Sequence, residues 1–147
     1  MAWGSCYICA SGIAANASYA AEEMEVNLND KGAVACGKGN TNVPFFGTTD
    51  VGAVKRICEL ASAVAEDCKT GACKILNIKD VSKADPELLR LLHKGHVQSV
   101  RVQWAQYRRG LEAYVSFGRV GEQYVMLRLV SETGKEWRAD KWEIAVT

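Results

Sequence analysis

Hydrophobic and polar residues alternate along the C-terminal third of the chain, which predicts antiparallel strands with one buried face. The glycine-containing segments 108–110 and 133–135 lie between the alternating runs and predict tight turns. The predicted buried face is consistently apolar and consists of Val100, Val102, Trp104, Leu111, Ala113, Val115, Phe117, Val125, Leu127 and Leu129. We therefore expect a meander of about four long strands.

The last of these strands changes phase along its length. Trp137 and Ala139 fall on one phase of the alternation and Trp142 falls on the other, unless one extra residue is accommodated near Asp140 and Lys141. An extra residue in one strand of an antiparallel pair is a β-bulge, which bends the strand. We therefore predict a bulge at Asp140 or Lys141 and a curved sheet.

Two amphipathic helices are predicted before the meander. Apolar residues recur at helical spacing after Thr49 and Asp50, either of which can cap a helix that runs to about Asp67. The Asp-Pro-Glu sequence at 85–87 predicts the start of a second helix, and Gly95 predicts its end. Both helices have an apolar face, so we expect them to lie on the sheet.

The N-terminal part of the chain is predicted to be a hairpin followed by a loop. Residues 24–28 alternate, a turn is expected at 29–32, and residues 33–36 form the return strand. The segment 37–47 contains two asparagines and Pro44 and is interpreted as a loop. We expect one domain over residues 1–147, with 1–47 as an extension and 48–147 as helices plus sheet. The expected fold class is α+β, with helices packed on a curved antiparallel sheet.

The C-terminal segment 134–144, with its sequence Gly-Lys-Glu-Trp-Arg-Ala-Asp-Lys-Trp-Glu-Ile, resembles the closing strand of nuclear transport factor 2-like domains. The resemblance extends over roughly residues 49–146 and implies a cone-like fold, in which helices close one side of a bent sheet around a pocket. It also implies that homodimers form through the sheet. Members of that superfamily include isomerases, dehydratases and hydrolases as well as binding and assembly domains, so the resemblance alone does not choose a function.

Charge gives no indication of a nucleic-acid or membrane partner. The chain has 147 residues, with 18 Lys plus Arg against 17 Asp plus Glu, and no apolar run is long enough for a membrane span. Arg108 and Arg109 are adjacent in a predicted turn, where a solvated turn is favoured over a phosphate contact. We expect no cofactor.

Cysteine usage leaves the compartment open. Six cysteines, at positions 6, 9, 36, 58, 68 and 73, suit either free or buried thiols in the cytoplasm or disulfides in a periplasmic or secreted protein. Free thiols, and hence the cytoplasm, are favoured, with Cys58 on the apolar face of a helix. The C-x-x-C pair at 6 and 9 lacks the turn residues of a zinc knuckle, so we expect no metal site.

Three ionisable residues are candidates for catalysis. The predicted buried face contains no Asp, Glu, His or Lys, which argues against a carboxylate-driven isomerase. The candidates that are left are Asp140 at the predicted bulge, His93 near a helix end and His96 in a turn.

Aromatic and apolar residues suggest two further sites. A pocket between helices and sheet is expected to contain Trp104, Val115, Phe117, Leu127 and Trp142. The opposite sheet face carries residues of types that are enriched at interfaces, namely Tyr114, Tyr124, Met126 and Arg128, and is a candidate homodimer interface.

Three functions are therefore compared. The first is a non-catalytic domain that binds a small hydrophobic molecule or supports assembly. The second is a small isomerase, dehydratase or hydrolase that uses a pocket Asp or His. The third is a disulfide-stabilised secreted inhibitor or immunity-type protein that acts through its surface.

Overall fold

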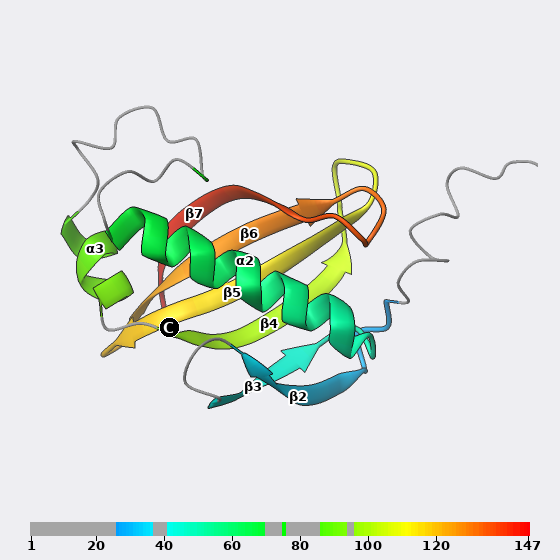
Figure 1. The fold of residues 1–147 in the computed structure, drawn as a ribbon, viewed down its shortest axis with the longest axis horizontal. Helices are drawn as coiled ribbons and strands as arrows, with labels where there is room; N and C mark the ends of the chain where they lie inside the picture. The colour runs from blue at the N-terminus through cyan, green and yellow to red at the C-terminus, as the bar shows by residue number, and fades with distance from the viewer. Residues whose placement is uncertain (1–25, 37–40, 70–74, 76–85, 94–95) are drawn as a thin grey trace, which may run out of the picture.

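The computed structural model describes residues 26–36, 41–69, 75, 86–93 and 96–147. Its elements are β2 (Lys31–Cys36), β3 (Thr41–Phe46), α2 (Val51–Lys69), α3 (Pro86–His93), β4 (Val97–Trp104), β5 (Leu111–Val120), β6 (Gln123–Ser131) and β7 (Arg138–Val146). The strands form one sheet in the order β2-β3-β4-β5-β6-β7. Helix α2 lies along one face of this sheet and α3 lies near one end of α2 (Figure 1).

The expectation of a cone-like fold on about four antiparallel strands is wrong. In the described ranges the sheet has six strands, because the N-terminal hairpin β2–β3 is part of it. Strand β3 pairs with β4 in parallel, with Phe45 opposite Val100 and Phe46 opposite Arg101. The other neighbouring strands are antiparallel. The sheet is therefore mixed, although antiparallel pairing dominates it.

The hairpin lies later in the chain than the sequence pattern predicts. Strand β3 occupies a segment that its asparagines and Pro44 mark as a loop, yet Val43 and Phe45 are only 1% and 4% exposed. Burial of these two side chains outweighs the low strand propensity of their neighbours. Pro44 pairs with Ala33 of β2, and the pairing with β4 begins one residue later, at Phe45.

A disulfide between Cys36 and Cys58 fastens the hairpin to the long helix. It joins β2 to α2 across a sequence separation of 22, with a Cα–Cα distance of 5.6 Å. Cys68 at the end of α2 is disulfide-bonded as well. The three cysteines in the described part of the chain are therefore all oxidised, whereas the sequence favoured free thiols. The pair at 6 and 9 lies outside the described residues.

The long helix begins at the predicted cap. Asp50 Oδ1 accepts a hydrogen bond of 3.0 Å from the Ala53 amide, and Thr48 Oγ1 accepts one of 3.0 Å from the Asp50 amide. The apolar face of α2 is buried against the sheet and consists of Ala53, Val54, Ile57, Cys58, Ala61, Val64, Ala65 and Cys68. The predicted cap and helical spacing are both confirmed.

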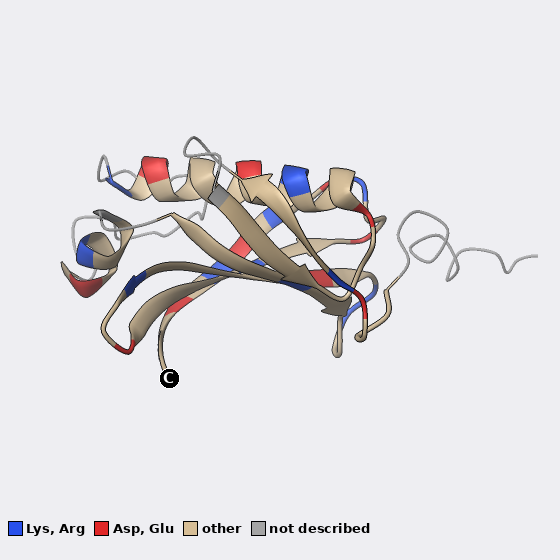
Figure 2. Ribbon diagram, turned by 90° about the horizontal axis from the view of Figure 1, so that it is seen from below, with Lys and Arg blue, Asp and Glu red and all other residues tan. Residues whose placement is uncertain are grey.

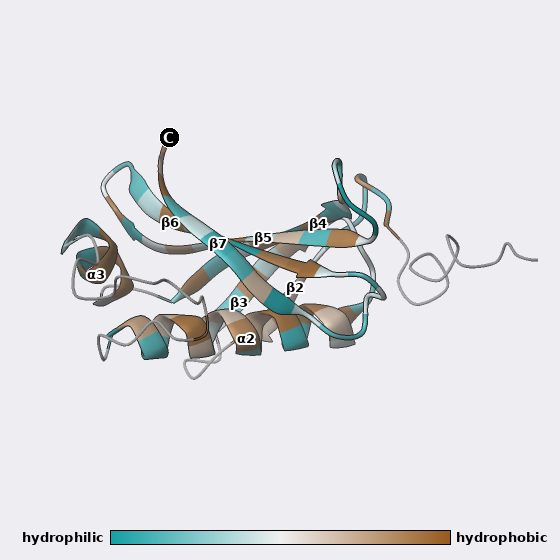
Figure 3. Cartoon of the chain, turned by 90° about the horizontal axis from the view of Figure 1, so that it is seen from above, coloured by the Kyte–Doolittle hydropathy of each residue, from teal (hydrophilic) through white to brown (hydrophobic). Residues whose placement is uncertain are grey.

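One face of the sheet and the apolar face of α2 form a single core. The predicted buried residues of β4, β5 and β6 are 0–3% exposed, except Trp104 at the end of β4, which is 44% exposed. Figure 3 shows α2 running along this face, and Figure 2 shows that no described helix covers the opposite face of the curved sheet. We call that opposite side the outer face.

The predicted bulge in the last strand is also confirmed. Arg128 of β6 pairs with Lys141 of β7 and the next residue, Leu129, pairs with Ala139, so Asp140 is the extra residue. The bulge restores the phase of the strand, because Trp142 and the residues before the bulge then pack against the same core. It also changes where the Asp140 side chain can reach.

Candidate functional site

A partly buried group of charged side chains lies on the outer face. The register puts Tyr114 of β5 opposite Arg128 of β6, and Arg128 opposite Lys141 of β7. Because of the bulge, no residue of β6 pairs with Asp140 in the strand register. The Asp140 carboxylate reaches Arg128 on the same face. We call Glu112, Tyr114, Arg128 and Asp140 the charged cluster.

Arg128 is the centre of the charged cluster. Its Nε donates a hydrogen bond of 2.6 Å to Asp140 Oδ2, its Nη2 contacts the same oxygen, and its Nη1 lies 3.8 Å from Glu112 Oε2. Burial by itself lowers the pKa of Arg128, but the hydrogen bond to Asp140 and the nearby carboxylates outweigh it, so the pKa is raised. Asp140 is therefore the counter-ion of Arg128.

Tyr114 is a hydrogen-bond donor within the same cluster. Its hydroxyl donates a bond of 3.1 Å to Glu112 Oε1. Desolvation raises the pKa of Tyr114, and the hydrogen bond to Glu112 and the negative charge of that carboxylate raise it further. The phenol therefore stays protonated at neutral pH, and the polar groups of the cluster largely satisfy one another.

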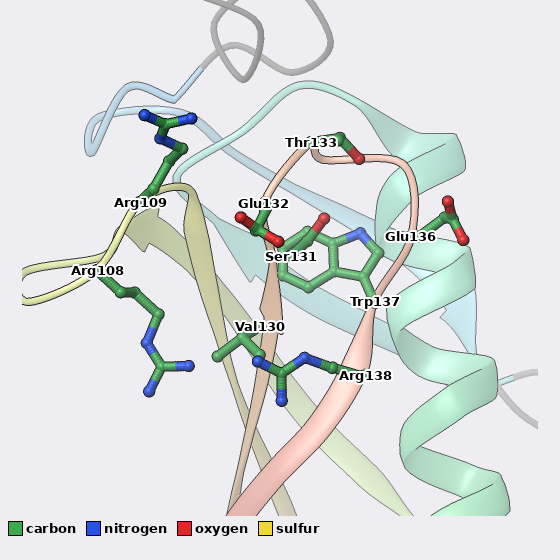
Figure 4. Close-up of a pocket in the computed structure, with 9 residues that line it drawn as sticks. All are labelled: Arg108, Arg109, Val130, Ser131, Glu132, Thr133, Glu136, Trp137 and Arg138. Atoms are coloured by element: carbon green, nitrogen blue, oxygen red, sulfur yellow. The ribbon is translucent and has the colours of Figure 1, made fainter. Parts of the chain in front are cut away.

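A cavity of about 340 Å³ lies next to the charged cluster, where the β4–β5 and β6–β7 connections meet (Figure 4). We call it the turn pocket. It is lined by Arg108, Arg109, Val130, Ser131, Glu132, Thr133, Glu136, Trp137 and Arg138. Arg108 joins the pocket to the cluster, because its Nη2 lies 3.5 Å from Asp140 Oδ2.

Local hydrogen bonds hold the walls of the turn pocket. Ser131 Oγ accepts a bond of 2.8 Å from the Gly134 amide, and Thr133 Oγ1 accepts one of 3.1 Å from the Lys135 amide. Side chains that bond to the backbone in this way define a turn without help from distant residues. The β6–β7 connection is therefore shaped before any ligand is bound.

Several donors in the pocket wall are unused within the described residues. Arg109 and Arg138 have no hydrogen-bond or ion-pair partner there, whereas Arg108 has its long contact to Asp140. The indole Nε1 of Trp137 is buried and also has no partner among these residues. A buried unsatisfied donor costs about 1–3 kcal/mol, so it calls for a physical explanation. The Trp137 ring packs against the core, which offsets part of that cost.

Asp140 and His96, two of the three predicted catalytic residues, belong to different parts of the described chain: Asp140 lies in β7 and His96 precedes β4. Asp140 is paired with Arg128 and Arg108 on the outer face. His96 is exposed just before β4, and its carbonyl accepts a bond of 3.3 Å from the Gly118 amide. His93 is the last residue of α3, and its side chain lies outside the described part.

The predicted ligand-binding residues are divided between core and surface. Val115, Phe117 and Leu127 are 0–3% exposed and belong to the core under α2. Trp142 is half-buried against that core, and Trp104 is 44% exposed. None of these five side chains lines the turn pocket.

The predicted interface residues do share the outer face. Tyr114, Tyr124, Met126 and Arg128 are all half-buried on it. Tyr114 and Arg128 bond within the charged cluster, and Tyr124 packs against Arg119, whose guanidinium carbon lies 4.8 Å from the ring centroid.

Two further findings concern the described residues. In the described ranges, no group of His, Cys, Asp and Glu is arranged to hold a metal ion. No described helix is long and apolar enough to cross a membrane.

Comparison with known proteins gives no match to a family model, to a curated protein or to a solved structure. The resemblance to nuclear transport factor 2-like domains stays a prediction. The sequence points to Arg108 and Arg109, to the turn at 133–135 and to Trp137 separately, but it does not show that these residues line one pocket. Arg138 and Trp137 reach it through the pairing of β6 with β7, which the alternation alone does not reveal.

Proposed function

We propose that the protein is a non-catalytic domain that binds a small molecule in the turn pocket. The observation that carries this proposal is the cavity itself, which combines Val130 and the Trp137 ring with several guanidinium groups. Ligand sites are typically concave and partly apolar, with a few polar groups that fix orientation. Arg138, which has no ion pair with the described residues, supplies such a group.

The arrangement of ionisable groups supports binding over catalysis. Asp140, one of the predicted catalytic residues, already has two guanidinium partners, Arg128 and Arg108. A general acid or base needs an ionisable group that is free to exchange a proton with the substrate. Asp140 instead pairs mainly with Arg128 beside the bulge, and its contact with Arg108 is longer, at 3.5 Å.

Chemical-shift mapping tests this proposal. A ¹⁵N-labelled sample of the oxidised protein is screened against a library of small molecules, and amide shifts are followed at Val130, Ser131, Thr133 and Trp137. We expect the hits to perturb these four signals together. Hits that bind at the core side of α2, or a screen that gives no hits, contradict the proposal.

A second candidate function is a secreted or periplasmic protein that acts through its surface. It is favoured by the oxidation of Cys36, Cys58 and Cys68, since disulfides persist in oxidising compartments. Counting the thiols that react in the denatured, unreduced protein tests this candidate. If Cys36, Cys58 and Cys68 react as free thiols, the result argues for the cytoplasm instead.

A homodimer through the outer face is the corresponding hypothesis for assembly. The half-buried Met126 lies on that face and is a suitable position for a disruptive charge. Sedimentation of wild type and Met126→Lys tests it: a dimer that the substitution dissociates supports the hypothesis, and a wild-type monomer rejects it.

A further inference from the structure

We propose that the ligand of the turn pocket carries an anionic group, either a carboxylate or a phosphate, that binds between Arg108 and Arg138 while its apolar part lies over Val130 and Trp137. This inference rests on the proposed function and names the class of ligand. It follows from the positions of the two guanidinium groups, from their weak engagement within the protein, and from the distribution of charge around them.

The two guanidinium groups approach the pocket from different connections of the sheet. Arg138 is opposite Val130 in the β6–β7 register, and Arg108 belongs to the β4–β5 connection. Figure 4 shows their guanidinium groups on the two sides of the Val130 side chain. Arginine presents a planar set of donors that matches a carboxylate or a phosphate, so two such groups around one apolar side chain form a suitable anion clamp.

Neither guanidinium group is strongly engaged. Arg108 Nη2 lies 3.5 Å from Asp140 Oδ2, at the outer limit of a hydrogen bond, and the same oxygen already accepts the 2.6 Å bond from Arg128 Nε. Arg138 has no ion pair with the described residues. An incoming anion can therefore bind both groups without breaking a strong internal bond.

The acidic residues of the pocket lie away from this clamp. The lining contains three arginines and two glutamates. Figure 4 shows the Glu136 carboxylate directed toward α2 and the Glu132 carboxylate beside Ser131, on the far side of Val130 from the Arg138 guanidinium. The carboxylate that does face Arg108, that of Asp140, lies 3.5 Å from it and is already paired with Arg128. Three guanidinium groups, those of Arg108, Arg128 and Arg138, thus stand against the two carboxylates of Asp140 and Glu112, which favours an anion over a cation.

Four matched probes test the inference by chemical-shift titration of the ¹⁵N-labelled protein: phenyl phosphate, benzoate, benzyl alcohol and benzylamine. They share an aromatic ring and differ in charge, and the first two distinguish a phosphate source from a carboxylate source. We expect phenyl phosphate, benzoate or both to shift the Val130 amide and the Trp137 indole signals, with affinity that falls as salt is added. The uncharged and cationic probes are expected to bind more weakly.

Three variants locate the charge that matters. Arg108→Gln and Arg138→Gln are each expected to raise the dissociation constant of the better anionic probe about tenfold, because each removes a charge-assisted hydrogen bond. Arg56→Gln is the control, because Arg56 is exposed on α2 and its loss changes net charge equally. The dissociation constant of the same probe for Arg56→Gln should stay within about twofold of the wild-type value.

The possible failures are distinguishable. If benzyl alcohol or benzylamine shifts the Val130 and Trp137 signals as strongly as the anions do, the pocket binds small molecules but the anionic class is wrong. An equal loss of affinity in all three variants also overturns the inference, since it shows a general charge effect. If no probe shifts these signals, the inference fails, and failure of the library screen as well would remove the proposed function.

Discussion

Removal of the Cys36–Cys58 disulfide in the double variant C36A/C58A is expected to lower the free energy of unfolding by about 3.5–4 kcal/mol. The bond closes a loop with a sequence separation of 22, and the loss of chain entropy for a loop of that length is worth about 3.4 kcal/mol at room temperature. Both side chains are buried, at 6% and 1% exposed, so truncating them adds a small packing loss. The hairpin should therefore be held much less firmly against α2.

Urea unfolding followed by circular dichroism measures this change in the oxidised wild type and the variant. Reduced wild type is the control, and it should lose at least as much stability as the variant, because reduction also opens the disulfide of Cys68. A change below about 1 kcal/mol, well under the loop-closure estimate, would refute the reasoning. So would a wild type in which the thiols of Cys36 and Cys58 react freely.

Three further outcomes are expected. Gly47→Ala should destabilise the protein by about 3 kcal/mol in urea unfolding, because the φ of Gly47 is +96° and a Cβ there would lie 2.0 Å from a carbonyl oxygen of β4. Gly121→Ala is the control and should cost only about 1 kcal/mol, because the φ of Gly121 is +62° but an added Cβ would meet no atom within 4 Å. Tyr114 should deprotonate above its ordinary pKa of 10.0, because burial disfavours the phenolate. Its contribution to stability is then complete below the unfolded-state pKa and is lost as pH rises through the folded-state pKa. Tyrosinate absorbance measures the pKa, and unfolding of wild type and Tyr114→Phe as a function of pH measures the loss of stability. Asp140→Ala should cost about 1–2 kcal/mol by leaving Arg128 without its main partner, and Asp140→Asn should cost less; equal losses would show that the carboxylate charge is irrelevant.

Sequence alternation was sufficient for the C-terminal half of the sheet. The buried face of β4, β5 and β6 and the bulge at Asp140 follow from the rule that side chains alternate between faces. The start of α2 follows from a local cap at Asp50. These features depend on interactions over a few residues or on a strict two-residue period, which one sequence contains.

Long-range pairing could not be read in the same way. The parallel contact of β3 with β4 joins Phe45 to Val100, and its stability comes from burial rather than from strand propensity. The partner of Cys58 depends on where the hairpin docks, so the cysteine count alone left free thiols favoured. The same limit applies to the turn pocket, because it forms only where two separate connections meet.

A crystal structure of the oxidised protein with phenyl phosphate, at a concentration above its measured dissociation constant, tests the central claim most directly. The account predicts the phosphate group between Arg108 and Arg138, with the ring over Val130 and beside Trp137. A ligand bound under α2 among the core residues, or a turn pocket that excludes the probe because Arg138 pairs with Glu132 or Glu136, would contradict it.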